Sequence, residues 1–449
     1  MKSKFLSLLA MLNGLCFYAL AQGQASEIVV TPYKTTVVCG DKARIVLTVI
    51  DKQGNAIANA TNAIHLKVTG DAKLIKADGE EISDGMLANG KLTVFLKAGK
   101  TKGLIKFEAT SDGLYKGETE IQAVQPGTPH PVTIGKPIAG NAIIKGKIIG
   151  ADISFLPELE ARGMKFSDTN GIPGDAIEIL KANGFNYIRL RIFNHPELKG
   201  GYSPGKGFCD LAHTLQMAKR IKAAGMKFLL DFHYSDYWAD PQHELTPAGW
   251  ANLDFKTLKD SVYQYTKYVV GALKQQGTAP DMVQVGNEIN HGMMWPDGAI
   301  NNLDSLANLI YAGVRGVKDA NPSTSIMLHI ALGGQNEESR WFLDNMLARK
   351  VPFDVIGLSY YPKWHGTLTD LKNNMSDLAT RYKKYVMVAE YSQLKQEVND
   401  IAFTAPGNKA LGTFIWEPLS TWEQVFDRSG KANAYLDVYR GIARKYGVR

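Results

Sequence analysis

Apolar and polar residues alternate along the first part of the chain. Between Ser26 and Val124, for example, the apolar residues Ile45, Leu47 and Val49 are each separated by one other residue. A period of two is typical of strands that bury one face, and turn sequences such as Lys52-Gln53-Gly54-Asn55 separate the runs. The pattern therefore predicts an all-β sandwich of about seven strands over residues 26–124.

The second part of the chain, from Ile144 onward, contains short apolar runs that alternate with amphipathic helical segments. In one such segment Leu215, Ala218 and Ile221 share a helical face, and the next apolar run follows directly after Gly225, as in βαβ units. The eight expected strands are Ile148–Ile153, Tyr187–Phe193, Lys227–His233, Met282–Gly286, Ile326–Ile330, Val355–Tyr360, Tyr385–Ala389 and Gly412–Trp416. Eight such units predict a (β/α)8 barrel over residues 144–449, with its active site at the carboxyl ends of the strands.

Two further segments belong to neither part. The stretch Gln125-Pro126-Gly127-Thr128-Pro129-His130-Pro131 cannot continue a strand ladder or a helix, so we expect a linker over residues 125–143. Lysines in the first four residues, an apolar run up to Leu20 and the small-x-small sequence Ala19-Leu20-Ala21 indicate a secretory signal peptide over residues 1–21. We expect export, and the sequence leaves open whether the protein resides in the periplasm, at the cell surface or outside the cell.

The composition limits the partners and cofactors to be considered. The 449 residues carry a formal net charge of +7 without a block of Lys or Arg, which indicates neither a nucleic-acid nor a membrane partner. No segment after the signal peptide has the roughly 20 apolar residues of a membrane span. Cys16 lies in the signal peptide, and Cys39 and Cys209 are too few for a disulfide framework or a metal site. We expect a monomer without a cofactor.

Two apolar runs of the second part lead directly into a glutamate. The fourth expected strand is followed by Asn287 and Glu288, and the seventh is followed by Glu390. Glycosidases use such a pair, because one carboxylic acid protonates the leaving oxygen while an ionised carboxylate meets the charge that develops on the sugar. A single glutamate could simply cap a strand end, but two at the mouth of one barrel favour glycoside hydrolysis.

Seven short motifs lie at or near the ends of the expected strands, and these are Gly150-Ala151-Asp152-Ile153-Ser154, Ile188-Arg189-Leu190-Arg191, the run from Asp231 to Pro241, Gly286-Asn287-Glu288, Trp295-Pro296, Ser359-Tyr360-Tyr361-Pro362 and Trp416-Glu417-Pro418. Together they resemble family 53 glycoside hydrolases, the endo-β-1,4-galactanases. The resemblance covers essentially all of the second part. It implies an endo-acting, retaining hydrolase of β-1,4-galactan, the side chain of pectin and of type I arabinogalactan, with Glu288 as acid/base and Glu390 as nucleophile. In the first part, the stretch from Asp84 to Thr110 resembles bacterial immunoglobulin-like domains.

The chain departs from this family in the region after the expected nucleophile. Tyr391 follows Glu390 where a smaller residue such as threonine is expected, and only a short stretch separates Glu390 from the last strand at Gly412. The long loops of some relatives, with calcium or disulfides, are therefore not supported here. This leaves the outer subsites of the substrate site open.

Two further residues have expected roles in catalysis. Arg189 is suited to hold Glu390 ionised and oriented, because a guanidinium offers fixed donors to a carboxylate. Arg191 points to the same side of its strand, and we favour Arg189 as the catalytic arginine and a structural ion pair for Arg191. Asn287 is expected to hydrogen-bond the sugar 2-hydroxyl, a contact that strengthens in the transition state, although it could simply shape the strand end.

Polar and aromatic residues near the strand ends are the expected substrate contacts. Tyr361, or Tyr360 if the register differs by one residue, is suited to donate to Glu390, and Trp416 is expected to form the floor under the sugar that is cleaved. Aromatic faces suit the apolar face of galactose, although any one of the tryptophans or His233 could instead belong to the core. The expected substrate-binding residues are His233, Asp236, Trp238, Trp295, Tyr360, Tyr361, Trp364 and Trp416, with Asp152 and Glu417 as supporting groups.

Alternative functions follow from the same residues. His233 with Asp231, Asp236, Asp240 and His243 could suggest a metal site, but their spacing matches no established ligand set and a retaining glycosidase needs no metal. Two other functions remain open: a related retaining clan A β-1,4-glycanase acting on mannan, xylan or a β-glucan, and a non-catalytic glycan-binding protein, which would not need both glutamates. The first part is expected to be a spacer or positioning module, and the sequence leaves open whether it touches the substrate.

Overall fold

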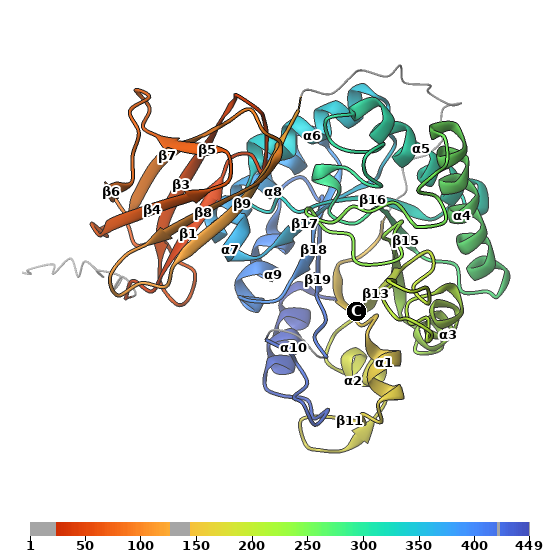
Figure 1. Ribbon diagram of the computed structural model, residues 1–449. Helices are drawn as coiled ribbons and strands as arrows, with labels where there is room; N and C mark the ends of the chain where they lie inside the picture. The colour runs from red at the N-terminus through yellow and green to blue at the C-terminus, as the bar shows by residue number, and fades with distance from the viewer. Residues whose placement is uncertain (1–23, 126–143, 420–422, 449) are drawn as a thin grey trace, which may run out of the picture.

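The structure is a computed structural model that describes residues 24–125, 144–419 and 423–448. The expected signal peptide, residues 1–21, and nearly all of the expected linker, residues 125–143, lie outside the described residues. Figure 1 shows a β-sandwich, coloured red to orange, beside a larger barrel that runs from yellow to blue. The fold predicted from the sequence, an all-β body followed by a (β/α)8 barrel, is confirmed.

The β-sandwich consists of two sheets with the strand orders β1-β3-β7-β5 and β2-β9-β8-β4-β6. Its strands within residues 24–125 are β1 (Glu27–Pro32), β2 (Thr36–Val38), β3 (Lys42–Ile50), β4 (Ala63–Thr69), β5 (Ala72–Ile75), β6 (Asp84–Met86), β7 (Lys91–Ala98), β8 (Gly103–Thr110) and β9 (Gly117–Val124). About seven strands were expected from the pattern, and β2 and β6 escape it because three residues are too few to show an alternation. The alternating residues Ile45, Leu47 and Val49 are fully buried between the sheets.

The barrel closes in the order β10-β13-β14-β15-β16-β17-β18-β19, each strand parallel to its neighbours. The strands are β10 (Ile148–Asp152), β13 (Tyr187–Ile192), β14 (Lys227–Phe232), β15 (Met282–Val285), β16 (Ser325–Ile330), β17 (Val355–Tyr360), β18 (Tyr385–Tyr391) and β19 (Ala410–Ile415). All eight strands expected from the sequence are present, with ends that differ by at most two residues. A short hairpin of β11 (Phe166–Ser167) and β12 (Pro173–Gly174) lies outside the barrel.

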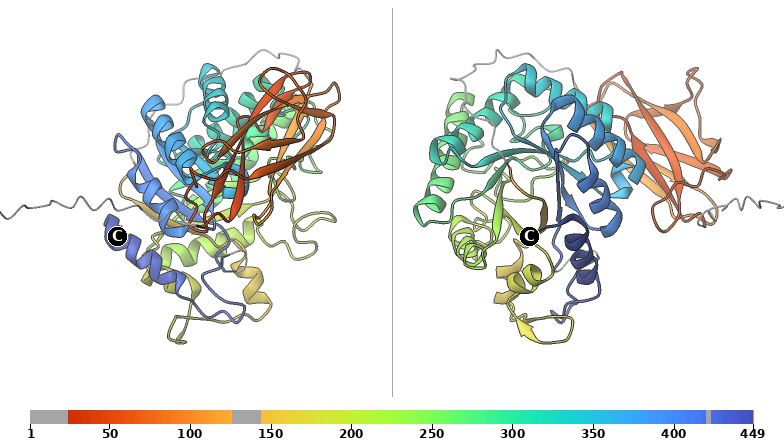
Figure 2. Two further views of the ribbon diagram at one scale, coloured as in Figure 1. Left: turned by 90° about the vertical axis from the view of Figure 1, so that its left-hand side faces the viewer. Right: turned by 180° about the vertical axis from the view of Figure 1, so that it is seen from behind.

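Helices surround the barrel, as the right-hand view of Figure 2 shows. They are α1 (Leu156–Ala161), α2 (Ala176–Ala182), α3 (Leu211–Ala223), α4 (Phe255–Gln275), η1 (Ile289–His291), α5 (Leu303–Ala320), α6 (Asn336–Ala348), α7 (Pro362–His365), α8 (Leu368–Tyr382), α9 (Lys395–Thr404) and α10 (Tyr435–Tyr446). Asp210 and Asp254 begin α3 and α4, because their carboxylates accept backbone N–H groups of the first turn. No helix in the described part of the chain is both long and apolar enough to cross a membrane.

The inside of the barrel changes from apolar to polar along the strands. Near their amino ends the buried side chains form an apolar floor, made of Ile148, Tyr187, Leu229, Met282, Met327, Val355, Met387, Leu411 and Phe414. Successive inward positions of a strand are two residues apart. Two residues beyond members of this floor stand the buried polar residues Arg189, Asp231, Gln284 and His329. The carboxyl ends of the strands therefore carry the polar groups that a reactive site requires.

The β-sandwich packs against one flank of the barrel. The short helix α7 contacts β1 and β9, and Figure 1 shows the sandwich alongside α6, α7 and α8. The side chain of Lys363 in α7 forms an ion pair with Glu118 of β9. The two bodies thus meet close to the carboxyl ends of the barrel strands.

Candidate active site

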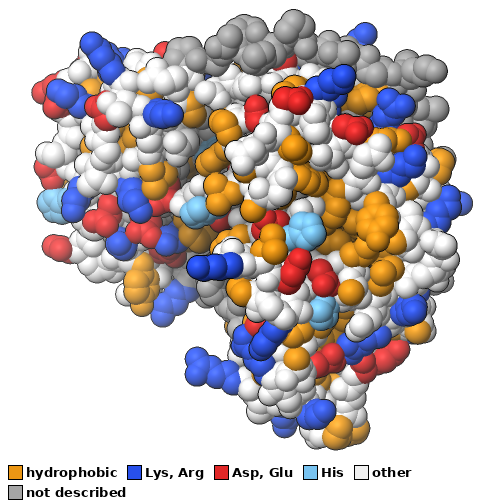
Figure 3. Space-filling model, turned by 45° about the vertical axis from the view of Figure 1, so that its right-hand side comes forward, with side chains coloured by type: hydrophobic (Ala, Val, Ile, Leu, Met, Phe, Trp, Pro, Cys, Tyr) orange, Lys and Arg blue, Asp and Glu red, His pale blue; other side chains and the backbone are white. Residues whose placement is uncertain are grey.

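Glu288 and Glu390 both face a cavity at the carboxyl end of the barrel. The cavity has a volume of about 520 Å³ and is lined by both glutamates, by Asn287 and by Arg189. Figure 3 shows the molecule from a side on which acidic and histidine side chains gather near the junction of the sandwich and the barrel. The structure therefore brings together the four residues that the sequence predicts as catalytic.

A sharp turn after β15 presents Glu288 to the cavity. Gly286 has φ 84°, and Glu288 itself adopts the left-handed conformation with φ 50° and ψ 42°. A residue with a β-carbon rarely adopts this conformation, and such strained residues cluster at functional sites. The turn points the Glu288 side chain into the cavity, so that its carboxylate lies across the barrel mouth from Glu390.

The two carboxylates lie close together. One oxygen of Glu288 and one of Glu390 are within 4.8 Å of each other. In retaining glycosidases the two carboxyl groups are about 5–5.5 Å apart, whereas inverting enzymes separate them by about 6.5–9.5 Å to admit a water. The two carboxylates of this cavity are thus closer together than those of inverting enzymes, which favours a retaining mechanism.

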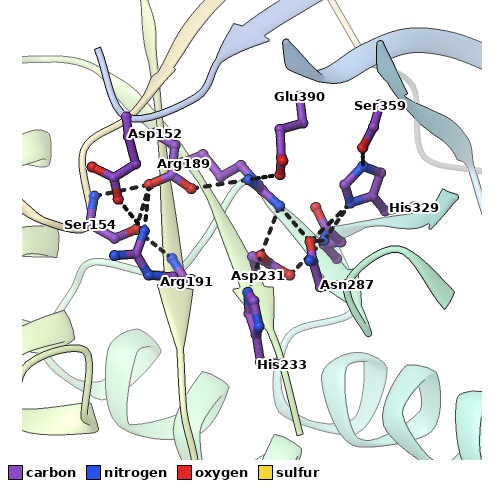
Figure 4. A network of polar contacts seen from close by, with 12 residues as sticks. Asp152, Ser154, Arg189, Arg191, Asp231, His233, Asn287, His329, Ser359 and Glu390 are labelled. Carbon is purple, nitrogen blue, oxygen red and sulfur yellow. Dashed lines mark hydrogen bonds and ion pairs between the residues drawn. The ribbon is translucent and has the colours of Figure 1, made fainter. Parts of the chain in front are cut away.

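Arg189 is the centre of a buried polar network (Figure 4). Its Nη1 donates to Glu390 Oε2 at 2.9 Å and to Asp152 Oδ2 at 3.1 Å. Its Nη2 donates to Asp231 Oδ2 at 2.9 Å and to Asn287 Oδ1 at 2.8 Å. The guanidinium therefore touches the expected nucleophile directly and fixes the residue next to Glu288.

Arg191 has a different role from Arg189. It pairs with Glu417 and lies 3.5 Å from Asp152, and its guanidinium stacks over the Trp238 ring at 4.2 Å from the ring centroid. Burial raises the pKa of the Glu417 carboxyl to about 7, while the charge of Arg191 opposes that shift. Arg191 contacts neither Glu288 nor Glu390 in the described hydrogen bonds and thus positions the wall of the cavity.

The environments of the two glutamates give them different protonation. Burial and then the charge of Glu390 raise the pKa of Glu288 well above its ordinary value. Burial also raises the pKa of Glu390, but the charge of Arg189 and a hydrogen bond from the Tyr361 hydroxyl, at 3.0 Å, offset part of that rise. Glu288 is therefore the carboxyl that keeps a proton, and Glu390 is the one that stays ionised.

A chain of hydrogen bonds supports Glu288 from behind. The Ser359 hydroxyl donates to Glu288 Oε1, His329 Nε2 lies 2.8 Å from Ser359 Oγ, and Gln284 Nε2 lies 3.0 Å from His329 Nδ1. Burial lowers the pKa of His329 well below its ordinary value, so the ring is neutral and carries one N–H. All three hydrogen bonds of this chain can form when Nε2 of His329 donates to Ser359 and Nδ1 of His329 accepts from Gln284. Oε2 of Glu288 is then left for the transferable proton.

Most of the expected substrate-binding residues lie in the cavity wall. His233, Trp238, Tyr361, Trp364 and Trp416 all line it. His233 is oriented by Asp231, which lies 3.1 Å from Nε2, and by the backbone N–H of Ala239, which donates to Nδ1 at 3.0 Å. Trp416 directly follows β19 and packs edge-on against Trp238, with ring centroids 6.2 Å apart and ring planes inclined at 66°.

Three expected substrate contacts do not line the cavity. The Tyr360 ring is buried in the core and its hydroxyl donates to the Gly366 carbonyl, so Tyr361 is the tyrosine that reaches Glu390. Asp236 instead accepts backbone N–H groups of His195 and Ala248 and ties two loops together. Trp295 directs its indole N–H to the His291 carbonyl. In each case a hydrogen bond to a backbone group holds the side chain outside the lining of the cavity.

Several residues of the site escaped the sequence prediction. His329, Ser359 and Gln284 lie within otherwise apolar strands, and Asp231 was considered only as part of a metal site. The available signal was a polar residue at an inward position of a buried strand, where an unpaired polar group is costly. A sequence does not reveal which of the two strand faces points into the barrel until the register is known.

One group of residues in the described chain has the geometry to hold a metal ion. Glu288, His329 and Glu390 each offer one ligand atom, and these atoms lie within 4.8 Å of one another. Both nitrogens of His329 already take part in hydrogen bonds, so a metal would have to displace Gln284 or Ser359. The group coincides with the two carboxylates that a glycosidase needs.

Two family comparisons divide the chain in the same way as the fold. The model of "Glycosyl hydrolase family 53" matches residues 148–403, which lie in the barrel. The model of "Glycoside hydrolase family 2 C-terminal domain 5" matches residues 28–120, which lie in the β-sandwich.

Individual relatives match the barrel. A probable arabinogalactan endo-β-1,4-galactanase A of Neosartorya fischeri is 36% identical over 309 residues, which cover 61% of this chain and 84% of that protein. The structure of a GH53 catalytic domain from Ignisphaera aggregans superposes with a TM-score of 0.63 at 34% identity, covering 70% of this chain and 99% of that one. A fungal β-1,4-galactanase structure gives a TM-score of 0.61 at 29% identity, covering 66% of this chain and all of the other.

Proposed function

The chain belongs to glycosyl hydrolase family 53, and from that premise we propose that it is an endo-β-1,4-galactanase that cleaves galactan with retention of configuration. The observation that carries this proposal is the pair Glu288 and Glu390, two carboxylates within 4.8 Å whose surroundings favour opposite protonation states. The family relationship and the galactanase relatives supply the substrate. A purely glycan-binding role would not require this pair.

The proposed reaction has two displacements at the anomeric carbon. Glu390 attacks that carbon while Glu288 gives its proton to the glycosidic oxygen, so the bond to the leaving chain breaks and a galactosyl ester of Glu390 forms. Glu288, now ionised, then takes a proton from a water that attacks the same carbon and releases Glu390. Each step inverts the centre, and the product keeps the β-configuration.

The neighbours of the glutamates have defined tasks in this scheme. Arg189 and Tyr361 hold the charge and the direction of Glu390 through hydrogen bonds of 2.9 and 3.0 Å. Asn287 donates one amide hydrogen to the Ala239 carbonyl at 2.8 Å, which leaves its second amide hydrogen for the sugar 2-hydroxyl. Trp416 and Trp238 offer aromatic faces to the apolar side of galactose.

Product analysis on a panel of β-1,4-linked polysaccharides tests the substrate. We expect galactan from pectin or type I arabinogalactan to give oligosaccharides of intermediate length first, as an endo-acting enzyme does, and little release from mannan, xylan or β-glucan. Cleavage of one of those polysaccharides with galactan left intact would assign the chain to another β-1,4-glycanase. A Glu390→Gln variant is the control for contaminating activity.

Proton NMR of the first products tests the stereochemistry. Hydrolysis of galacto-oligosaccharides is expected to release the β-anomer first, with the α-anomer appearing later through mutarotation. An initial α-anomer would mean that water attacks directly, and Glu390 could not then be the nucleophile.

We also propose that the protein is exported, acts as a monomer and needs no metal. The basis for export is the mostly apolar run up to Leu20 together with the small-x-small sequence Ala19-Leu20-Ala21 at its end. Determining the N-terminus of the protein from the native host tests export, light scattering tests the oligomeric state, and activity after dialysis against EDTA tests the need for a metal.

A further inference from the structure

Residues of the β-sandwich form part of the wall of the cavity that holds Glu288 and Glu390. These residues are Thr35, Leu104, Thr119, Glu120 and Gln122. Leu104 of β8 is paired with Gln122 of β9, and Lys106 with Glu120 two positions along, so their side chains share the outer face of one sheet. A sheet surface that begins outside the barrel thus continues directly into the catalytic cavity.

The sandwich is held firmly at this place. Thr35 donates to the buried Glu338 of α6 through its backbone N–H at 2.5 Å and its hydroxyl at 2.9 Å, and the backbone N–H of Thr36 donates to the same carboxylate at 3.2 Å. The Thr35 hydroxyl also lies 3.0 Å from Nε2 of His291. Gln242, in the loop after β14, hydrogen-bonds Glu120. The wall therefore has a fixed position relative to the reacting groups.

These contacts locate the wall on one side of the scissile bond. His291 comes three residues after Glu288, and the other barrel residues that meet the sandwich, Gln242, Glu338 and Lys363, follow β14, β16 and β17. They occupy the sector around the acid/base strand β15. Because the acid/base protonates the leaving oxygen, the leaving part of the polysaccharide extends into this sector.

We propose that the β-sandwich completes the substrate cleft, and that Leu104 and Gln122 bind galactose units on the leaving-group side of Glu288. The proposal rests on the galactanase function proposed above. Leu104 is partly exposed and offers an apolar surface to a sugar ring. The Gln122 amide makes one long hydrogen bond, of 3.4 Å to the Ala123 carbonyl, and can bond sugar hydroxyls. The β-sandwich therefore strengthens the binding of long galactan chains relative to short ones.

A matched pair of double variants tests the proposal. In Leu104→Ala/Gln122→Ala the cavity wall loses both side chains, whereas Met86→Ala/Lys67→Ala removes two exposed side chains from the same sheet at its other edge, in β6 and β4. Each variant is compared with wild type on long β-1,4-galacto-oligosaccharides and on an aryl β-galactobioside, whose leaving group contains no galactose unit. Wild-type cleavage of galactan establishes the parent function independently.

We expect the Leu104/Gln122 variant to lose about 3- to 10-fold in kcat/KM on the long substrates, mostly through KM, since one lost hydrogen bond and one lost apolar contact weaken binding by that order. The loss on the aryl substrate stays below about twofold, and the control variant follows wild type on both. Equal losses on both substrates would indicate a structural defect and overturn the proposal, as would unchanged kinetics on the long ones. Absence of galactan cleavage by wild type would instead refute the parent function.

Discussion

The groups that surround each glutamate decide its role at the scale of single residues. Glu390 is held between a guanidinium and a phenol, both of which stabilise its negative charge. Glu288 faces that charge from within 4.8 Å and has a serine hydroxyl as its neutral partner. A cavity with this asymmetry contains an acid and a base at the same pH.

The first prediction concerns this pair. Glu288→Gln and Glu390→Gln are each expected to lower turnover by about 10²–10⁴-fold or more, because the general acid or the nucleophile is lost while the shape of the side chain is kept. Oligosaccharide binding should change little. Steady-state kinetics and calorimetric titration measure the two effects, and Glu178→Gln, an exposed glutamate in α2, is the control. A variant that retained more than about a tenth of the activity would remove its residue from the mechanism.

Azide is expected to restore part of the activity of Glu390→Ala and to give a product of inverted configuration.

The second prediction concerns the serine behind Glu288. Burial and the charge of Glu390 raise the pKa of Glu288, and the hydrogen bond from Ser359 opposes that rise. Ser359→Ala removes the opposing contribution, so the pKa of Glu288 rises further. Because the reaction needs Glu288 protonated, the alkaline limb of the pH profile of kcat/KM should move to higher pH.

The control for this effect is Ser392→Ala. Ser392 is another buried serine near the barrel mouth, and its hydroxyl has no hydrogen-bond partner among the described residues. The Ser392 variant should keep the pH profile of wild type. A shift of the alkaline limb to lower pH in Ser359→Ala would mean that the Ser359 hydroxyl favours the protonated form of Glu288.

Sequence reasoning at this scale identified the charged residues but few of their partners. Glu288, Glu390, Arg189 and Asn287 stand in motifs at strand ends, and the structure places all four at one cavity. Ser359 and His329 were not predicted, because a serine or histidine in a buried strand can have many structural roles. Their role behind the acid/base is visible only from the hydrogen bond between Ser359 and Glu288 and the one between His329 and Ser359. These contacts depend on side chains from three different strands.

At the scale of elements, the ends of β15 and β18 are irregular, and these irregularities aim the two glutamates. The pairing of β17 with β18 shifts by one residue after Leu358, so that Ser359 pairs with Glu390 rather than with Ala389. In a regular strand Glu390 would point away from the inward side chains of Met387 and Ala389. The positions of all eight strands were predictable from apolar runs, but this shift was not, because it depends on the pairing with the neighbouring strand.

The third prediction concerns the turn after β15. Gly286 has φ 84°, and a β-carbon there would lie 2.5 Å from the Ile289 side chain. Gly286→Ala is therefore expected to destabilise the barrel by about 1–3 kcal/mol. Because the turn aims Glu288, a displacement of its carboxylate by about 1 Å would also lower kcat by about 100-fold. Thermal unfolding and steady-state kinetics measure the two effects.

Gly271→Ala is the control for this substitution. Gly271 lies inside α4, where an added β-carbon meets nothing within 4 Å. Alanine there should stabilise the protein by about 0.5–1 kcal/mol, because glycine is the poorer helix former. A Gly286→Ala variant with wild-type stability and activity would show that the turn tolerates a side chain and does not aim Glu288.

At the scale of the whole molecule, the sandwich and the barrel act on one substrate site. Each body could be recognised from its own apolar pattern, and each matches its own family. Their contact could not be predicted, because Thr35 and Gln122 look like ordinary surface residues of a sandwich until the sandwich is placed against α6 and α7. The expectation of a spacer or positioning module therefore omitted the part of the sandwich that enters the cavity.

The last prediction concerns the stability of this contact as a function of pH. Burial raises the pKa of Glu338 from 4.5 to about 7, although hydrogen bonds from Thr35 and Thr36 oppose the rise. The folded protein thus keeps a proton on Glu338 up to about pH 7, whereas the unfolded chain releases it near pH 4.5. Between these values the folded state binds more protons, so the contribution of Glu338 to the free energy of unfolding falls as the pH rises.

Glu338→Gln removes this titration, and the melting temperature of wild type relative to the variant should therefore fall between pH 5 and pH 8. Hydrogen exchange at the amides of Thr35 and Thr36 reports the same loss locally, since both donate to this carboxylate. Glu337→Gln, the exposed neighbouring glutamate of α6, should show no such trend. If the difference between wild type and Glu338→Gln were constant over this pH range, the carboxyl would keep one protonation state throughout, and the junction between sandwich and barrel would not respond to pH through Glu338.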